Sequence, residues 1–423
     1  MKGIKRKLAA VVMSALVLGS CGETGLESYE HNSRIRIGFS WWGKDVRHNY
    51  TTEAIDVFES QNDDISVYPE YAEWLGFKDR MDTKMGSGTQ ADVMQMNFNW
   101  LYEYAGKGYS FYDLRKLEEY IDLNNFDSNV LEYGTIDGKL LGIPISMNAQ
   151  TVYLNKSLFD KYNLPIPETW EDYFAAADVM QKDGIYILRL SKSSSWHFCI
   201  AYAEQKTGKR FFDEQGNVGF GKEDMAVLFD FYKQMTDKGV TVPIDDRDRK
   251  DFEDGKAAGT VMWISDAEYY VAPCRDKGNE IVVADYPAME GASVYGWYAK
   301  PTSLYCISES TEHPQEAARF ISFLLCSEEM TKLRGLENGV PVCKSALEVL
   351  AANDMIDGIQ LEADEMRKKH TPSVKLLSPY TETSAFMEKF DELNKRVYNG
   401  ETDVDTAAGE LYDTILTVMG NNN

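Results

Sequence analysis

The chain has few cysteines and histidines for its length, which limits disulfide and metal chemistry. Its 423 residues include six cysteines and five histidines. The five cysteines after the N-terminal leader are widely spaced, and none is combined with a histidine at metal-ligand spacing: Cys199, Cys274, Cys306, Cys326 and Cys343. This pattern argues against a disulfide framework, although it leaves room for one disulfide bond. We expect most of these cysteines to be small buried apolar residues, and we expect no metal and no cofactor.

The chain also lacks a long hydrophobic run and an excess of basic residues. The apolar run Leu8–Leu18 has eleven residues, about half of what a membrane-spanning helix needs, and no later run reaches membrane-spanning length. The 68 Asp and Glu residues outnumber the 44 Lys and Arg residues, so the net charge is −24. An acidic chain is repelled by nucleic acid and by anionic lipid, which argues against a polyanionic ligand. The length predicts two or three globular domains.

Signatures of catalysis are missing as well. Gly38–Lys44 has the spacing of a phosphate-binding Walker A loop, but Asp45 replaces the Ser or Thr that would bind magnesium. The histidines form no HExxH pair, and there is no GxSxG motif. Residues 213–224 have the spacing of a calcium-binding loop, but Val218 replaces its turn glycine, so we expect a hairpin over residues 213–217. The sequence therefore indicates no catalytic site.

The N-terminus has the pattern of a secretion signal. Four basic residues precede the apolar run: Lys2, Lys5, Arg6 and Lys7. The run is followed by small residues and a cysteine in the tetrapeptide Leu18-Gly19-Ser20-Cys21. The closing tetrapeptide resembles the lipobox of bacterial lipoproteins, which implies that Cys21 is acylated and becomes the mature N-terminus. The alternative is an ordinary signal peptide with an incidental cysteine. We predict a signal peptide over 1–20 and a polar tether over 21–33. Removal of the signal leaves 40 Lys and Arg against 68 Asp and Glu, a net charge of −28.

Predicted strands and helices alternate along the rest of the chain, which is typical of an α/β fold. The hydrophobic patterns and the capping signals predict strands over 34–39, 65–67 and 91–96 and helices over 51–61, 169–181 and 314–325.

Aromatic residues make up 12% of the chain, and its eight tryptophans are spread over the whole length. A sugar has a flat C–H face that packs on an aromatic ring and a rim of hydroxyls that bonds to polar side chains. Polar residues flank several of the tryptophans: Lys44, Asp45 and Arg47 near Trp41 and Trp42, Gln95 and Asn97 near Trp100, and Ser265 and Asp266 near Trp263. We assign Trp170, which follows a helix cap, to packing. Adjacent residues that leave a strand do not easily point into one core, so we expect Trp41 and Trp42 to reach a ligand.

Several motifs occur in the order found in family 1 extracellular solute-binding proteins, the receptors of bacterial ABC sugar importers. Residues 133–144 resemble the element "DGKLYGIP" of that family, and the similar segments that follow are 153–159, 167–172, 252–258, 307–325 and 339–342. Ser40–Gly43 with Arg47 and His48 resembles the branch that takes up oligosaccharides. The resemblance extends from Arg34 to the C-terminus.

The resemblance implies two interleaved α/β lobes with a ligand cleft between them. By analogy the chain crosses between the lobes near Met147, near Pro301 and over 342–345. Lobe 1 would comprise 34–147 and 302–343, and lobe 2 would comprise 148–301 and 344–423. The cleft would close on a ligand, and a membrane permease would recognise this closed form. We expect the receptor to be a monomer that is held to the cell membrane by lipid.

The candidate ligand-binding residues come from both lobes and from the first crossing. They are Trp41, Trp42, Arg47, Trp74, Gln95, Asn97, Trp100, Asn148, Trp196, Trp263, Ser265 and Trp297. For each polar candidate, a structural role in a cap or turn is an equal alternative. We predict that Trp41 or Trp74 and Trp263 or Trp297 hold the ligand from opposite sides.

Two other functions remain open at this stage. A membrane-anchored glycoside hydrolase would also be acidic and rich in aromatic residues, but it would need a committed pair of carboxylates. A carbohydrate sensor or adhesin without a transport role is the second alternative, and neighbouring permease genes would distinguish it from a receptor.

Overall fold

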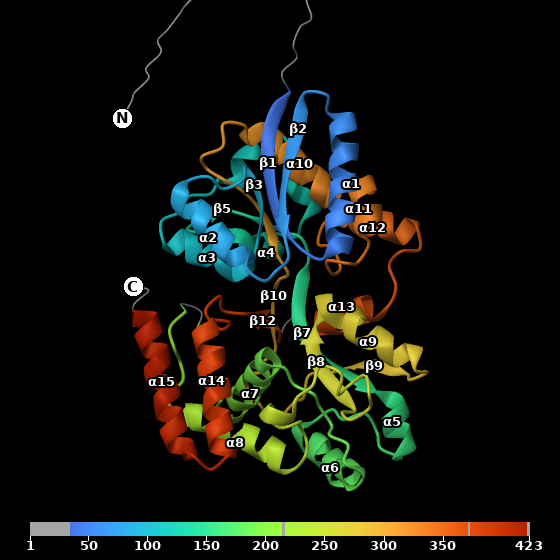
Figure 1. The fold of residues 1–423 in the computed structure, drawn as a ribbon, viewed down its shortest axis with the longest axis vertical. Coiled ribbons are helices and arrows are strands. Elements are labelled where there is room, and N and C mark those ends of the chain that lie inside the picture. The colour runs from blue at the N-terminus through green and yellow to red at the C-terminus, as the bar shows by residue number, and fades with distance from the viewer. Residues whose placement is uncertain (1–33, 214–215, 371–372, 421–423) are drawn as a thin grey trace, which may run out of the picture.

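The protein has two α/β lobes stacked along its long axis, as Figure 1 shows. The computed structural model describes residues 34–213, 216–370 and 373–420. The predicted signal peptide over 1–20, the tether over 21–33 and Cys21 lie outside the described residues. Within the described ranges, no helix has the length and apolar character needed to cross a membrane. The predicted two-lobed α/β fold is confirmed.

The first lobe contains a five-stranded sheet with the order β2-β1-β3-β11-β6. β1 is parallel to β2 and β3, and β11 is antiparallel to β3 and β6. Both faces of the sheet are covered by helices, so the strands are largely apolar. The strands are β1 (Ile35–Trp42), β2 (Ile65–Ala72), β3 (Val93–Met96), β4 (Thr135–Ile136), β5 (Lys139–Leu140), β6 (Ile143–Pro144) and β11 (Leu304–Ile307). The helices are α1 (Asp45–Gln61), α2 (Phe77–Ser87), α3 (Phe98–Gly106), α4 (Ser128–Leu131), α10 (Pro314–Cys326), α11 (Glu328–Arg334) and α12 (Lys344–Ala352).

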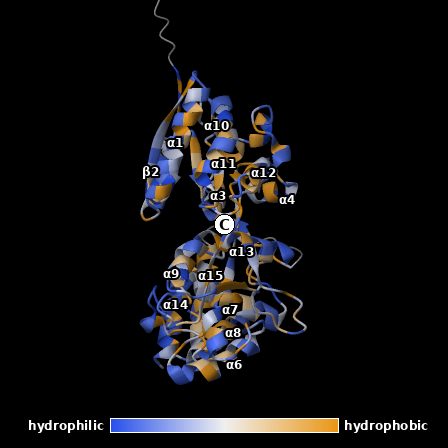
Figure 2. Ribbon diagram, turned by 90° about the vertical axis from the view of Figure 1, so that its right-hand side faces the viewer, coloured by the Kyte–Doolittle hydropathy of each residue, from blue (hydrophilic) through white to orange (hydrophobic). Residues whose placement is uncertain are grey.

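The second lobe is built around β7, whose nine residues are all buried and which pairs with strands on both of its edges. Its sheet has the order β12-β10-β7-β8, and β9 also pairs with β7. The strands are β7 (Met147–Asn155), β8 (Gly259–Trp263), β9 (Ile281–Ala284), β10 (Tyr298–Pro301) and β12 (Lys375–Leu376). The helices are α5 (Lys156–Lys161), α6 (Trp170–Met180), α7 (Lys192–Thr207), α8 (Lys222–Asp237), α9 (Ala267–Asp276), α13 (Ile359–Lys369), α14 (Ser384–Tyr398) and α15 (Val404–Gly420). Figure 2 shows the two lobes from the side, coloured by hydropathy.

Two segments that are far apart in the sequence pass side by side between the lobes. Met147 at the start of β7 pairs with Pro301 at the end of β10. Just outside this pair, the Thr302 amide donates to the Ser146 carbonyl at 2.9 Å. The Ser146 and Thr302 hydroxyls also lie 2.6 Å apart. Paired segments of this kind restrict how the lobes move relative to one another.

The third crossing differs from the predicted one. α12 packs against α10 and α11, and its Ala346 belongs to the hydrophobic core of the first lobe. The chain therefore passes to the second lobe over residues 353–358, between α12 and α13, rather than over 342–345. Residues 344–352 pack with the first lobe, whereas the predicted bounds assign them to the second. The apolar face of α12, which includes Leu350, accounts for the difference because it is buried there.

Candidate functional site between the lobes

The parallel strands of the first lobe end at one edge of its sheet. β1 pairs in parallel with both β2 and β3, so the carboxyl ends of these three strands lie together. In Figure 1, β1 starts at the outer end of the first lobe and runs toward the second lobe. Ligand sites of open α/β sheets lie at the carboxyl ends of the strands. The region between the lobes is therefore where a site is expected.

A cluster of three tryptophans, here called the tryptophan platform, lies at this edge: Trp42, Trp74 and Trp100. Trp74, in the loop between β2 and α2, is 52% exposed, whereas Trp42 and Trp100 are buried. The rings of Trp74 and Trp100 stack with their centroids 4.9 Å apart and their planes 13° apart. The ring centroid of Trp42 lies 5.3 Å from the ring centroids of both Trp74 and Trp100. The two buried rings support Trp74, which presents its indole to the outside.

An ion pair lies in the second lobe beside Trp263, the last residue of β8. Lys300 and Glu382 contact each other, and their side chains are only 9% and 11% exposed. The Lys300 Nζ lies 4.4 Å from the centroid of the Trp263 ring. Burial raises the pKa of Glu382, but the Lys300 ammonium and other neighbours lower it more, so the net pKa is below the ordinary value. Glu382 is therefore ionised and neutralises the charge of Lys300.

Polar contacts connect the two lobes at this point. Asn99 in α3, the neighbour of Trp100 in the chain, donates from Nδ2 to the Glu382 Oε2 at 3.2 Å. Lys44, at the start of α1, places its Nζ 4.2 Å from the centroid of the Tyr269 ring in α9. The tryptophan platform and the ion pair are thus joined through Asn99.

Buried polar atoms without a partner surround the ion pair. Gln150 donates to the Ser193 hydroxyl at 3.0 Å and contacts the His197 Nδ1 at 3.2 Å. The Asn99 Oδ1, the Gln150 Oε1 and the His197 Nε2 have no hydrogen-bond partner among the described residues. Because buried polar groups in folded proteins are normally hydrogen-bonded, these atoms leave hydrogen-bonding capacity unused beside the ion pair. Burial lowers the pKa of His197, so its imidazole is neutral and can donate or accept. We call Asn99, Gln150, His197, Lys300 and Glu382 the interlobe polar cluster.

A cavity of about 470 Å³ opens beside this cluster. Tyr102 of α3 lines it from the first lobe, and His197, Tyr298 and Thr381 line it from the second. The cavity therefore has walls from both lobes, and it is large enough for a small saccharide.

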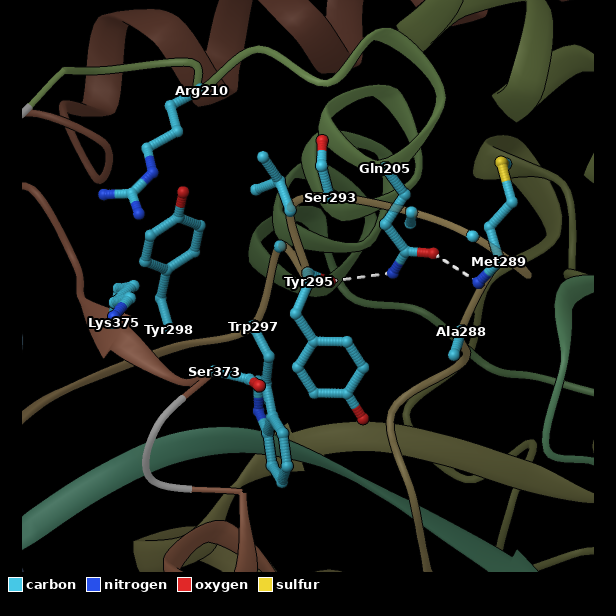
Figure 3. Close-up of a pocket in the computed structure, with 14 residues that line it drawn as sticks. Gln205, Arg210, Ala288, Met289, Ser293, Tyr295, Trp297, Tyr298, Ser373 and Lys375 are labelled. Carbon is cyan, nitrogen blue, oxygen red and sulfur yellow. Dashed lines mark hydrogen bonds between the residues drawn. The ribbon is translucent and has the colours of Figure 1, made fainter.

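A second cavity of about 450 Å³ lies in the second lobe and shares Tyr298 with the first. Figure 3 shows its lining, in which the Gln205 amide donates to the Tyr295 carbonyl and accepts from the Met289 amide. The polar atoms of Gln205 are thus already bonded within the lobe. This cavity lacks a wall from the first lobe, so we do not include it in the candidate site.

Glu204 lines the interlobe cavity from α7 and has an unusual ionisation. Burial raises its pKa from 4.5 to about 7, although the Phe211 amide and the Tyr298 hydroxyl, which donate to the carboxyl group, act in the opposite direction. The cavity wall therefore carries a carboxyl group that titrates near neutral pH.

Three of the predicted tryptophans lie in hydrophobic cores, and Trp297 among them also lines the second cavity. Trp41 is 1% exposed and stacks on Phe39. Trp196 is fully buried, and its Nε1 donates to the Thr381 carbonyl at 2.7 Å. Trp297 is 2% exposed and donates to the Gln150 carbonyl. Trp41 and Trp42 both reach a core because neighbouring strand residues point to opposite faces of a sheet, each of which has its own core.

The predicted polar candidates bond to the protein itself. Arg47 forms a bidentate ion pair with Glu337. Gln95 accepts a hydrogen bond from the Trp42 amide and donates one to the Ser303 hydroxyl. Asn97 caps α3, and Asn148 and Ser265 bond to each other through both backbone and side chain. These residues position the strand ends and leave Trp74 and Trp263 as the predicted residues with surface available to a ligand. The members of the interlobe polar cluster were not predicted, because only the folded chain brings them together.

Comparisons with known proteins agree with this architecture. The family of bacterial extracellular solute-binding proteins matches residues 53–362. A protein of Brucella abortus named as a binding protein is 25% identical over 305 residues, which are 70% of this chain and 73% of the relative. An uncharacterized ABC transporter extracellular-binding protein of Pyrococcus horikoshii is 31% identical over 133 residues, 31% of this chain and 30% of the relative.

Solved structures show the same fold over nearly the whole length. A periplasmic solute-binding protein from Pectobacterium atrosepticum has a TM-score of 0.86 and 28% identity, with 92% of this chain and 99% of the other covered. A periplasmic oligogalacturonide-binding protein from Yersinia enterocolitica, in complex with saturated digalacturonic acid, has a TM-score of 0.83 and 30% identity, with 92% and 100% covered. Since the family match spans most of the chain, this protein belongs to the bacterial extracellular solute-binding proteins.

Proposed function

We propose that this protein is a lipid-anchored receptor that binds a neutral oligosaccharide between its lobes and delivers it to the permease of an ABC transporter. The observation that carries the proposal is that the exposed Trp74 stacks on Trp100, whose neighbour in the chain, Asn99, donates to Glu382 of the interlobe polar cluster. An indole packs on the C–H face of a sugar, and unpartnered amide and imidazole atoms bind its hydroxyls. The receptor acts as a monomer in this proposal.

The relatives support a transport role and a sugar ligand. The Pyrococcus relative is named as the extracellular-binding protein of an ABC transporter, and the Yersinia structure contains a saturated digalacturonic acid. That ligand is acidic, whereas we propose a neutral one for this chain. Lys300, the cation of the interlobe polar cluster, is already neutralised by Glu382, and the whole chain carries a net charge of −24.

A melting-temperature screen against neutral and uronate oligosaccharides tests the ligand class. A ligand at a hundred times its Kd adds about 2.7 kcal/mol to the stability of the folded state. We expect neutral glycans to raise the melting temperature and matched uronate glycans to leave it unchanged. Stabilisation by the uronates alone would contradict a neutral ligand.

Recovery of the ligand separates a receptor from a glycoside hydrolase. The purified protein is incubated for a day with the glycan that stabilises it, and the mixture is analysed by chromatography. A receptor returns the glycan intact. New products that require the protein would favour the hydrolase.

The lipid anchor is tested at Cys21. We expect Cys21→Ala to leave the protein unprocessed or to release it from the membrane fraction, because acylation of this cysteine would supply the anchor. The natural chain is fractionated in parallel. A variant that is processed and membrane-bound like the natural chain would show that Cys21 is not the anchor.

A further inference from the structure

Two cysteines that are distant in the sequence meet in the first lobe. Cys326 is the last residue of α10, and Cys343 directly precedes α12. Their Sγ atoms lie 2.6 Å apart. This distance lies between the ~2.05 Å of a disulfide bond and the separation of unbonded atoms, which for carbon is ~3.5–4.0 Å. The backbone around the two residues thus already brings the sulfur atoms within reach of a covalent bond.

We infer that Cys326 and Cys343 form a disulfide bond in the exported protein. The inference rests on the extracytoplasmic location in the proposed function, because disulfide bonds form and persist outside the cytoplasm. The other three cysteines in the described residues, Cys199, Cys274 and Cys306, are free and buried. The bond therefore selects one pair out of five cysteines.

The position of Cys343 favours its reaction. It is the N-cap of α12, and a helix N-terminus favours the thiolate form of a cysteine. The contact with Cys326 lowers the pKa of Cys343 and raises the pKa of Cys326. Since the thiolate is the nucleophile in disulfide exchange, Cys343 is the attacking residue.

The bond forms by two thiol–disulfide exchanges with a small-molecule disulfide. The Cys343 thiolate attacks one sulfur of that disulfide, forms a mixed disulfide and releases the other half as a thiolate. Cys326 then loses its proton, attacks the Cys343 sulfur and releases the second half. Two protein thiols are oxidised, one small disulfide is reduced to two thiols, and the electrons balance. Because Cys343 is 1% exposed in the complete fold, we expect the exchange to occur late in folding, when α12 has formed and its N-terminus is not yet covered.

The bond would fix the segment that carries the contacts near the lobe crossings. It closes a loop over residues 327–342, which contains α11. In this loop Glu337 pairs with Arg47, and the Asn338 carbonyl accepts from the Ser146 hydroxyl at the first crossing. Figure 1 shows α10, α11 and α12 together on the first lobe. The disulfide therefore holds the loop to the helices on both of its sides.

Peptide mapping tests the bond directly. The exported chain is denatured, its free thiols are alkylated, and it is digested with trypsin without reduction. We expect the peptides Phe320–Lys332 and Gly335–Lys344 to be joined and to separate after reduction. Recovery of both peptides unlinked and alkylated would overturn the inference. Glycan binding is measured on a native portion of the same preparation. A lack of glycan binding would contradict the proposed receptor without affecting the peptide result.

A melting experiment provides a second test, in which each chain is compared with itself in the presence and absence of reductant. We expect a thiol reductant to lower the melting temperature of the natural chain by several degrees, because the loop over 327–342 is then open. The double variant Cys326→Ala/Cys343→Ala should not respond, whereas the control Cys306→Ala should respond like the natural chain. An equal response of the natural chain and the double variant would overturn the inference.

Discussion

Trp41 and Trp42 are neighbours in the chain, but their side chains lie on opposite faces of the first sheet. Trp41 packs with Phe39 in one core, and Trp42 packs with Trp74 and Trp100 in the other. The tryptophans of this protein therefore differ in role according to their exposure. Trp74 is the one with more than half of its surface exposed.

Trp41→Ala should weaken folding more than it weakens ligand binding. We expect the free energy of unfolding to fall by ~3–5 kcal/mol, as for other large aromatic side chains removed from a core. Denaturant unfolding of Trp41→Ala and Trp74→Ala, measured side by side, checks this. A larger loss of stability in Trp74→Ala than in Trp41→Ala would contradict the assignment of Trp41 to the core.

Glu204→Gln should change how stability depends on pH. Between pH 4.5, the ordinary pKa, and about 7, the pKa in the folded protein, the unfolded chain loses this proton while the folded chain keeps it. The stability of the natural chain therefore falls as pH rises through this window. We expect Glu204→Gln to lack this decline, a relative gain on the order of 3 kcal/mol by pH 8.

Denaturant unfolding at pH 4 to 8 measures the effect, with Glu348→Gln as the control at an exposed position. The control should parallel the natural chain. If Glu204→Gln and the natural chain show parallel profiles, Glu204 does not carry a raised pKa.

At the scale of elements, the loop between α11 and α12 is held to α1 by one ion pair. The Arg47 Nε and Nη2 each donate to a Glu337 oxygen at 3.0 Å, and the Tyr50 hydroxyl donates to the same carboxylate at 2.7 Å. The Arg47 and Glu337 side chains are 15% and 32% exposed. The pair is thus partly shielded from water, which strengthens it relative to a surface pair.

Arg47→Met should lower the stability of the protein by about 3 kcal/mol, because it leaves the Glu337 carboxylate partly buried without its counter-ion. A double-mutant cycle with Glu337→Gln measures the coupling by denaturant unfolding. We expect the double variant to be less destabilised than the sum of the two single variants. Additive effects would show that the two side chains do not interact.

The elements were easier to predict from the sequence than the site. The helices over 169–181 and 314–325 correspond to α6 and α10, because a capping box and a regular apolar stripe mark them. Phe212 and Val218, which flank the predicted hairpin over 213–217, form an antiparallel bridge, whereas residues 214–215 of that hairpin lie outside the described residues. α1 starts at Asp45 rather than at residue 51, because its first turns carry polar residues that interrupt the apolar pattern.

The site could be predicted only in part. Trp263 stands out as a tryptophan with polar neighbours and Trp74 as one that follows the second predicted strand, and the structure leaves surface on both. Lys300 and Glu382 are 82 positions apart, and Asn99 is 283 positions from Glu382. Pairs at such separations depend on how the two lobes fold and meet. No local pattern of residues indicates them.

At the scale of the whole molecule, the lobes meet through polar contacts near the cavity and through paired segments at the crossings. Asn99 and Lys44 of the first lobe contact Glu382 and Tyr269 of the second. A ligand with groups for both lobes can favour the closed arrangement. Ligand binding and lobe closure are therefore coupled in this account.

The most direct test of the account is calorimetric titration of a stabilising oligosaccharide into the natural chain, Trp74→Ala, Trp263→Ala and the double variant. Each single change removes an aromatic surface from a different lobe. We predict that each weakens binding by about thirty-fold, corresponding to ~2 kcal/mol, with little change in the melting temperature of the ligand-free protein. If either change leaves the affinity unaltered, the ligand does not contact both lobes and the account is contradicted.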